Sequence, residues 1–206
     1  MLNDLILPVP VLMINRRAAL PEPLLRHILK NLGYPQELIM SGQTLDGAEK
    51  MMIQHLPNLI FYSAFERADL DFIKTIKHCC PSSHLVTFHQ AAQAELISAA
   101  LQAGADAYLL DGASAEAAQQ QMKSILRGGA ALHPQLARRL QQEAFNSAGS
   151  FAAAGQLSPA EQQILRLISQ SSTAEQAAVQ LKLSPYQVDG LIRNIFRKLA
   201  TLGPSA

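Results

Sequence analysis

The sequence lacks the features that mark membrane-inserted, secreted and disulfide-stabilised proteins. Its 206 residues contain no Trp, and the two cysteines, Cys79 and Cys80, are adjacent, which excludes both a disulfide framework and a CxxC metal or redox motif. No apolar run approaches the roughly 18 residues that span a bilayer. The short apolar stretch near the start has no basic segment before it. We therefore expect a protein of the reducing cytoplasm.

Catalytic and cofactor motifs are also missing. The sequence has no Walker loop, no G-x-G-x-x-G and no G-x-S-x-G, so we expect neither an enzyme nor a bound cofactor. His78 stands beside Cys79-Cys80 with His84 nearby, but these residues do not have the spacing of a tetrahedral metal site. We expect them to be structural and predict no metal.

The charge that is present divides the chain into two parts. Residues 1–126 hold 9 Lys+Arg and 12 Asp+Glu, a net charge of −3, whereas residues 127–206 hold 8 and 4, a net charge of +4. This division predicts two modules. The second is mildly suited to a polyanionic partner, although so small an excess is weak evidence for nucleic acid.

The front half alternates short aliphatic runs with longer amphipathic stretches, the pattern of a parallel α/β sheet. The predicted strands are Val9–Ile14, Glu37–Met40, Asn58–Tyr62, Leu85–Phe88 and Ala107–Leu110. The predicted helices cover residues 20–32, 46–55, 69–79, 91–102 and 114–126. Five such units predict a doubly wound, flavodoxin-like domain over residues 1–127, whose functional groups gather at the carboxyl ends of the strands.

The back half is predicted to be helical. Residues 128–156 are rich in Ala, Gly, Ser and Gln and are interpreted as a linker with a short helix at Pro134–Glu143. Residues 157–206 then contain three Ser/Thr-x-x-Glu/Gln capping boxes, each of which marks a helix start. The boxes pair Ser158 with Glu161, Thr173 with Gln176, and Ser184 with Gln187.

The last of these helices has one apolar face and one polar face. The apolar stripe consists of Val188, Leu191, Ile192, Ile195, Phe196 and Leu199. The polar side carries Gln187, Asp189, Arg193, Asn194, Arg197 and Lys198. Three short helices with a tight break at residues 182–184 fit a helix-turn-helix unit whose third helix enters a major groove. A small helical interaction domain fits the pattern equally well.

These residues resemble the DNA-binding domain of LuxR/NarL-type transcription regulators. The positions that fall on the family pattern are Leu157, Ser158, Glu161, Leu165, Ile168, Ala178, Leu181, Val188, Ile192 and Leu199. The front half resembles the receiver domain of the same family, most clearly in the segment GADAYLLDG at residues 104–112. The resemblance therefore implies a response regulator over nearly the whole chain.

The receiver departs from this family at the positions that carry phosphorylation. A phosphorylatable receiver has an Asp after the third strand, an acidic pair after the first, a Ser/Thr after the fourth and a Lys after the fifth. The corresponding residues here are Ser63, Asn15 with Arg16, His89 and Asp111. An amide and a cation do not hold Mg²⁺, and Asp111 repels a phosphate, so we expect conventional aspartyl phosphorylation to fail.

Nearby residues do not restore the site. Asp69 and Asp71 are predicted within the following helix, and Asp46 starts another. Phosphorylation of Ser63 by another route stays open beside the simpler interpretation of a turn residue. A pair between Arg16 and Asp111 that fixes the receiver without phosphate is likewise weighed against two solvated side chains.

The resemblance implies that the last helix lies in the major groove. Its implied DNA contacts are Thr173, Gln187, Asp189, Arg193, Arg197 and Lys198. The family usually has a Lys where Asp189 stands and a β-branched residue where Gly190 stands. Asp189 is four residues before Arg193 and is predicted to pair with it in the free protein. Gly190 weakens the helix by roughly 0.5–1 kcal/mol relative to Ala.

Two functions follow from these departures. The first is a phosphorylation-independent DNA-binding regulator that acts as a homodimer, controlled by abundance, a protein contact or a small ligand on the receiver. The second is an adaptor or antagonist that has lost DNA affinity through Asp189 and Gly190 and binds another regulator or a signalling protein. The variant Asp189→Lys separates them, because it strengthens DNA binding only if charge is what was lost. The Ala-rich segments at residues 91–102 and 114–126 are candidate dimer surfaces.

Overall fold

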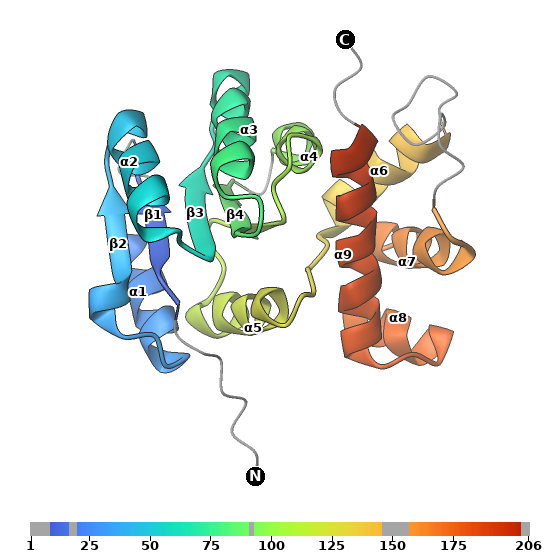
Figure 1. The fold of residues 1–206 in the computed structure, drawn as a ribbon. Helices are drawn as coiled ribbons and strands as arrows, with labels where there is room; N and C mark the ends of the chain where they lie inside the picture. Colours follow the sequence, from blue (N-terminus) through green and yellow to red (C-terminus); the bar gives the residue numbers. More distant parts are fainter. Residues whose placement is uncertain (1–8, 17–19, 91–92, 146–156, 203–206) are drawn as a thin grey trace.

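The computed structural model of the chain describes residues 9–16, 20–90, 93–145 and 157–202. Its front half is a five-stranded parallel sheet in the order β2-β1-β3-β4-β5 (Figure 1). The strands are β1 Val11–Ile14, β2 Ile39–Gly42, β3 Leu59–Ser63, β4 His84–His89 and β5 Ala107–Leu110. This order is that of flavodoxin-like sheets, so the predicted α/β receiver-like fold is confirmed.

The strands are short apolar runs because the sheet is covered on both faces. All four residues of β1 are fully buried, which is what a central parallel strand requires. One strand prediction was displaced: Glu37–Met40 was expected, but residues Gln36–Leu38 form a 3₁₀ turn (η1) and β2 begins at Ile39. Pro35 immediately before this turn has extended geometry, and β2 pairs with β1 only from Ile39 onward.

Two helices cover one face of the sheet and three cover the other. Helices α1 Glu22–Asn31 and α5 Ala115–Leu126 contribute to one buried cluster. Helices α2 Leu45–His55, α3 Leu70–Cys79 and α4 Ala94–Gln102 contribute to the second. A 3₁₀ turn, η2 Arg67–Asp69, precedes α3. Gly104 takes a φ of +115° where α4 ends, a left-handed geometry that lets the chain turn into β5.

The back half is helical. Its helices are α6 Pro134–Phe145, α7 Pro159–Ser169, α8 Ala174–Leu181 and α9 Pro185–Leu202. Helix α6 lies in the range interpreted as a linker, but it is a packed helix: Leu136, Ala137 and Leu140 are buried, and α6 contacts both α4 and α7. Residues 128–133 of that range are described and belong to no helix or strand, and residues 146–156 lie outside the described residues.

The two halves share a continuous hydrophobic core. The cluster on the α2-α3-α4 face of the sheet extends through α6 to the buried residues of α7, α8 and α9. Helix α9 stands against the front half beside α4 (Figure 1). Within the described ranges, no helix is both long and apolar enough to cross a membrane.

Candidate nucleic-acid interface

At the carboxyl edge of the sheet, Asn15, where the resemblance implies an acidic residue, connects the loop after β1 to α1. Its Nδ2 donates to Glu22 Oε1 at 2.8 Å, and its Oδ1 accepts from the backbone N–H of Leu20 at 3.0 Å. Both polar atoms of the amide are therefore used within the fold. Asn15 acts here as a structural link.

Arg16, beside Asn15, pairs with Asp69 and not with Asp111. The Arg16 Nη1 to Asp69 Oδ1 distance is 3.1 Å, so Arg16 neither makes the pair with Asp111 that was weighed as one alternative nor is a fully solvated side chain. Asp69 closes η2 and is 3% exposed, because its carboxylate turns back toward the end of β3. Asp69 was expected within the following helix, but it ends η2 and directly precedes α3.

Asp69 is nevertheless not a free magnesium ligand. Besides Arg16, its carboxylate accepts from Tyr62 Oη at 3.3 Å and from the backbone N–H groups of Phe65 at 2.9 Å and Glu66 at 3.1 Å. Burial and the Asp69 charge raise the pKa of Tyr62 to about 12, which keeps its hydroxyl a donor. The described residues contain no group of three His, Cys, Asp or Glu placed to hold a metal.

Ser63 and His89 end neighbouring strands but point to opposite faces of the sheet. In the β3–β4 register Ser63 is opposite Phe88, so His89 faces the other way with Thr87. Both residues are buried, and Ser63 Oγ and His89 Nδ1 have no hydrogen-bond partner among the described residues. Burial lowers the pKa of His89 to about 4, and its Nε2 lies 2.9 Å from Thr87 Oγ1. The two residues therefore form no nucleophile–base pair.

Asp111, where the resemblance implies a Lys, is exposed after β5. Its carboxylate accepts from the backbone N–H of Gly112 at 2.9 Å, and Gly112 has a φ of +78°. The residue thus closes a turn and keeps its negative charge at the edge of the sheet. A phosphoryl group would be repelled there.

The candidate DNA-binding helices form as predicted. All three capping boxes are present, and the third uses Gln187 Oε1, which accepts from Ser184 N at 2.8 Å. Lys182 ends α8 in the left-handed conformation, with a φ of +55°, and α9 begins three residues later. The apolar stripe of α9 is buried except for Leu191, which is partly exposed. On the polar side of α9, Gln187, Asn194 and Arg197 are exposed.

Part of that polar side faces the protein's own receiver. Asp189 Oδ2 accepts from Ser124 Oγ of α5 at 2.6 Å, and its backbone carbonyl accepts from Ala130 N at 3.1 Å. Burial raises the pKa of Asp189, an effect that the Ser124 hydrogen bond opposes. The approach is close because residue 129 is glycine: a Cβ there would lie 2.8 Å from Asp189 Cβ.

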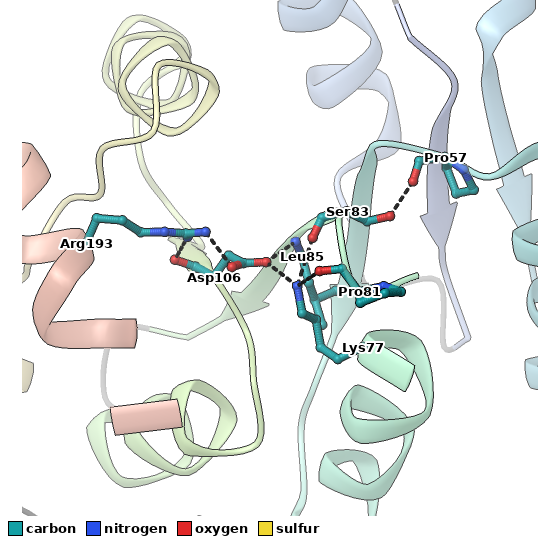
Figure 2. Close-up of polar contacts among 7 residues, drawn as sticks. All are labelled: Pro57, Lys77, Pro81, Ser83, Leu85, Asp106 and Arg193. Atoms are coloured by element: carbon teal, nitrogen blue, oxygen red, sulfur yellow. Dashed lines mark hydrogen bonds and ion pairs between the residues drawn. The ribbon is translucent and has the colours of Figure 1, made fainter. Parts of the chain in front are cut away.

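Arg193 makes the second contact, one turn further along α9. Its guanidinium forms an ion pair with the carboxylate of Asp106 and donates to the Asp106 carbonyl (Figure 2). Arg193 is 4% exposed. The predicted Asp189–Arg193 pair was therefore wrong, since each side chain has a partner in the front half of the chain.

Asp106 also holds the receiver together at this point. Its Oδ2 accepts from Lys77 Nζ at 3.0 Å and from the backbone N–H of Leu85 at 2.8 Å. Lys77 Nζ also donates to the carbonyls of Pro81 and Ser83, at 3.2 and 2.9 Å (Figure 2). Asp106 directly precedes β5, so this network lies at the amino edge of the sheet, opposite the edge that holds Asn15 and Ser63.

Aromatic contacts complete the interface. Phe196 of α9 packs against Tyr108 of β5 with ring centroids 6.1 Å apart, and Tyr108 Oη accepts from His133 N at 2.8 Å. At the other end, Arg127 donates to Tyr186 Oη at 2.8 Å and lies over its ring. Apolar packing and charge therefore act together to hold α9 against the receiver.

Of the other four predicted DNA contacts, three are exposed and one forms an ion pair within the chain. Thr173 and Gln187 are exposed and serve as helix caps, and Arg197 is exposed. Lys198 pairs with the buried Glu161 at 2.6 Å. Asp106, Lys77 and Ser124 were not identified from the sequence, because their role depends on where α9 docks. The only hint was GADAYLLDG, which contains Asp106.

No protein-family model matches the chain. A similar curated protein is the transcriptional regulatory protein YdfI of Bacillus subtilis (strain 168), which is 28% identical over 147 residues, 69% of this chain and 68% of that protein.

Solved structures resemble the chain in fold. The RcsB response regulator of Salmonella typhimurium matches 93% of this chain and 92% of its own, with a TM-score of 0.51 and 15% identity. A response regulator from Thermotoga maritima matches 58% of this chain and 98% of its own, with a TM-score of 0.51 and 18% identity. A LuxR family DNA-binding response regulator from Silicibacter pomeroyi covers 62% of this chain at a TM-score of 0.50 and 21% identity. The chain therefore has the fold of response regulators and is similar in sequence to a transcriptional regulatory protein.

Proposed function

We propose that the protein is a DNA-binding transcription regulator of the LuxR/NarL type that does not use aspartyl phosphorylation. The observation that carries this proposal is α9, an 18-residue helix after a tight turn that buries an apolar stripe and keeps a polar side. A helix of this kind, supported by α7 and α8, fits a helix-turn-helix whose last helix reads the major groove. The similarity to a transcriptional regulatory protein supports it.

The receiver supports the phosphate-independent part of the proposal. Asn15 is used within the fold, Asp69 is neutralised by Arg16, and Asp111 places a negative charge where a phosphate would need a cation. None of these residues offers a free carboxylate pair for Mg²⁺. We propose control by the contact between α9 and the receiver, in place of phosphorylation.

In this arrangement the DNA-reading side of α9 is partly covered. Asp189 is bound by Ser124 and Arg193 by Asp106, so neither side chain can reach a base while these contacts persist. DNA binding then requires the halves to separate, and the affinity is lowered by the fraction of molecules that are open. Dimerisation adds avidity across two half-sites. Helix α4, one candidate dimer surface, lies against α6 and α9 of the same chain.

The test is fluorescence anisotropy of the full chain with DNA selected from a genomic pool, at several salt concentrations. Arg197→Gln removes an exposed cation from α9, and Arg166→Gln removes one from α7 as the matched control. We expect saturable binding that falls steeply with salt, with a smaller salt slope in Arg197→Gln and an unchanged slope in the control. Absence of binding at low salt contradicts the proposal.

One observation favours the adaptor as a second candidate. Lys198 and Arg193 are engaged within the chain, and Glu175 and Asp189 bring negative charge to the same helical pair. An adaptor predicts no DNA binding even when α9 is released. It predicts instead a stable complex with another regulator. The variant Asp189→Lys separates the two functions, because it breaks the Ser124 contact and adds a cation at once.

A further inference from the structure

A cavity of about 380 Å³ lies where α9 meets the start of β5 and the end of α3. Its charged walls come from Lys77 and Asp106 of the receiver and from Arg193 and Arg197 of α9. Its remaining walls are largely small or apolar, and include Ala105 and Phe196. The volume falls within the range of small-molecule sites, roughly 300–1,000 Å³.

The cavity has more positive charge than its own carboxylate can neutralise. Lys77, Arg193 and Arg197 are three cations around Asp106, and Asp106 is shared between Lys77 and Arg193. Arg197 forms no hydrogen bond or ion pair with any described residue. Arg193 Nε is buried and has no acceptor among the described residues. The exposed Arg197 therefore supplies the unused donors, and the cavity has a net charge of about +2.

We propose that this cavity binds a small phosphate monoester. Such a group carries a charge of about −1.5 to −2 at pH 7, which matches the excess charge of the cavity. The planar guanidinium of Arg197 suits two phosphate oxygens at once. The ring of Phe196 and the small side chains beside it supply an apolar wall for the carbon part of the ligand.

The effect on function rests on the proposed DNA binding. The cavity takes Lys77 from the receiver and Arg193 and Arg197 from α9, so it is complete only while α9 is docked. A ligand that binds the docked arrangement better shifts the population toward it. The phosphate monoester therefore weakens DNA binding, and DNA weakens binding of the monoester by the same factor.

The first experiment measures ligand binding in the absence of DNA. Glycerol 3-phosphate is titrated into the full chain by calorimetry and thermal unfolding at constant ionic strength, beside inorganic phosphate, sulfate, succinate and glycerol. We expect glycerol 3-phosphate to bind saturably and to raise the unfolding temperature. Weaker binding of inorganic phosphate identifies an ester site, whereas equal binding identifies the phosphate group alone as the ligand and overturns the ester part of the proposal.

Variants locate the site. Arg197→Gln is expected to weaken glycerol 3-phosphate binding about tenfold or more, because it removes a charged partner, and Arg166→Gln is expected to leave it unchanged. Lys77→Gln tests the receiver wall of the same cavity. The proposal is overturned if sulfate or succinate binds as well as the phosphates, or if binding is the same in Arg197→Gln, Lys77→Gln and the unmodified chain.

A second experiment separates this inference from the proposed function. The anisotropy titration with DNA is repeated at saturating glycerol 3-phosphate, where we expect a lower DNA affinity. Ligand binding without any DNA binding supports the cavity and overturns the proposed function. DNA binding that does not change at saturating ligand overturns the coupling between the two.

Discussion

The two edges of the parallel sheet use their charges differently. At the carboxyl edge, where receivers hold their phosphorylation site, Arg16 and Asp69 pair within the receiver and Asn15 is tied to α1. At the amino edge, Asp106 joins Lys77 of the receiver to Arg193 of α9, 87 positions further along the chain. The charged groups of the carboxyl edge pair within the front half, whereas those of the amino edge connect the two halves.

This difference bears on the proposed control of DNA binding. At the carboxyl edge, the described residues include no group of three His, Cys, Asp or Glu placed to hold a metal. The amino edge holds instead a buried guanidinium whose ion-pair partner lies in the other half of the chain. Such a pair is costly to break in place, but separation of the halves returns both groups to water.

The largest effect is expected where a side chain is forced between the halves. A Cβ at Gly129 would lie 2.8 Å from Asp189 Cβ across the contact, and 2.6 Å from Ser124 Oγ and 3.2 Å from the Ser124 carbonyl in its own half. The Asp189 contact is the one that undocking of α9 relieves, so Gly129→Val disfavours the docked arrangement. Overpacking costs about 1–3 kcal/mol. We therefore expect DNA affinity in the anisotropy titration to rise about tenfold or more.

The control for this variant is the other glycine near the contact. A Cβ at Gly190 meets nothing within 4 Å, so Gly190→Ala leaves the docking unchanged and stabilises α9 by roughly 0.5–1 kcal/mol. If Gly129→Val and Gly190→Ala both bind DNA with the affinity of the unmodified chain, docking of α9 at the amino edge does not limit DNA binding.

A smaller effect on stability is expected when one carboxylate at each edge is neutralised. Asp106→Asn leaves the buried Arg193 without its counter-charge and is expected to lower the free energy of unfolding by about 3 kcal/mol. Asp69→Asn is expected to lower it by about 2 kcal/mol, because its partner Arg16 is partly solvated. Urea unfolding measures both values.

Hydrogen exchange separates the two variants further. The Ala130 N–H donates to the carbonyl of Asp189 and so reports on docking of α9. We expect its protection to be lost in Asp106→Asn and kept in Asp69→Asn. Equal protection in both variants would mean that Asp106 has no special part in joining the halves.

The pH dependence of stability tests whether His89 is buried in its neutral form at the carboxyl edge. The folded-state pKa of His89 is lowered to about 4 by burial, whereas the unfolded side chain titrates near its ordinary value of 6.5. Below pH 6.5 the unfolded chain binds the proton first, so stability falls from about pH 6.5 to pH 4, by roughly 3 kcal/mol in total. Unfolding midpoints across this range test it.

His84, whose pKa burial also lowers, adds to the same trend. The variant His89→Gln is therefore expected to reduce the slope of stability against pH without removing it. A slope identical to that of the unmodified chain would show that His89 titrates normally in the folded protein.

Treatment with a phosphoryl donor is expected to have no effect. An acyl phosphate donor with Mg²⁺ should leave the intact mass and the DNA affinity unchanged, because the carboxyl edge has Ser63 in place of the acceptor and Arg16 beside it. The same outcome is expected after Ser63→Asp, since Asn15 still lacks the charge for the metal. A phosphorylated species of either protein would restore the carboxyl edge as the control point.

The sequence predicted what depends on local pattern. The five strands follow from buried aliphatic runs, and the three capping boxes mark α7, α8 and α9 because a Ser or Thr and a Glu or Gln satisfy each other's backbone amides locally. The expected loss of aspartyl phosphorylation was inferred from the residue types of Asn15, Arg16, Ser63 and Asp111, and it stays a prediction.

The sequence did not predict partners that are distant along the chain. Asp189 and Arg193 are four residues apart and suggested a helical pair, but both lie on the side of α9 that docks, and Ser124 and Asp106 compete for them. For Arg16, a pair with Asp111 and a solvated side chain were the two alternatives, whereas the turn after β3 brings Asp69 to it. Tertiary packing decided each case.

A reversible cross-link between α5 and α9 tests most directly whether docking of α9 blocks DNA binding. Ser124 Oγ lies 2.6 Å from Asp189 Oδ2, so Ser124→Cys with Asp189→Cys places two thiols across the contact, in a background with Cys79→Ser and Cys80→Ser. We predict that the oxidised protein does not bind DNA and that reduction of the same sample restores binding. Equal DNA affinity in the cross-linked and reduced forms, or failure of the cross-link to form under oxidant, would contradict this description of the molecule.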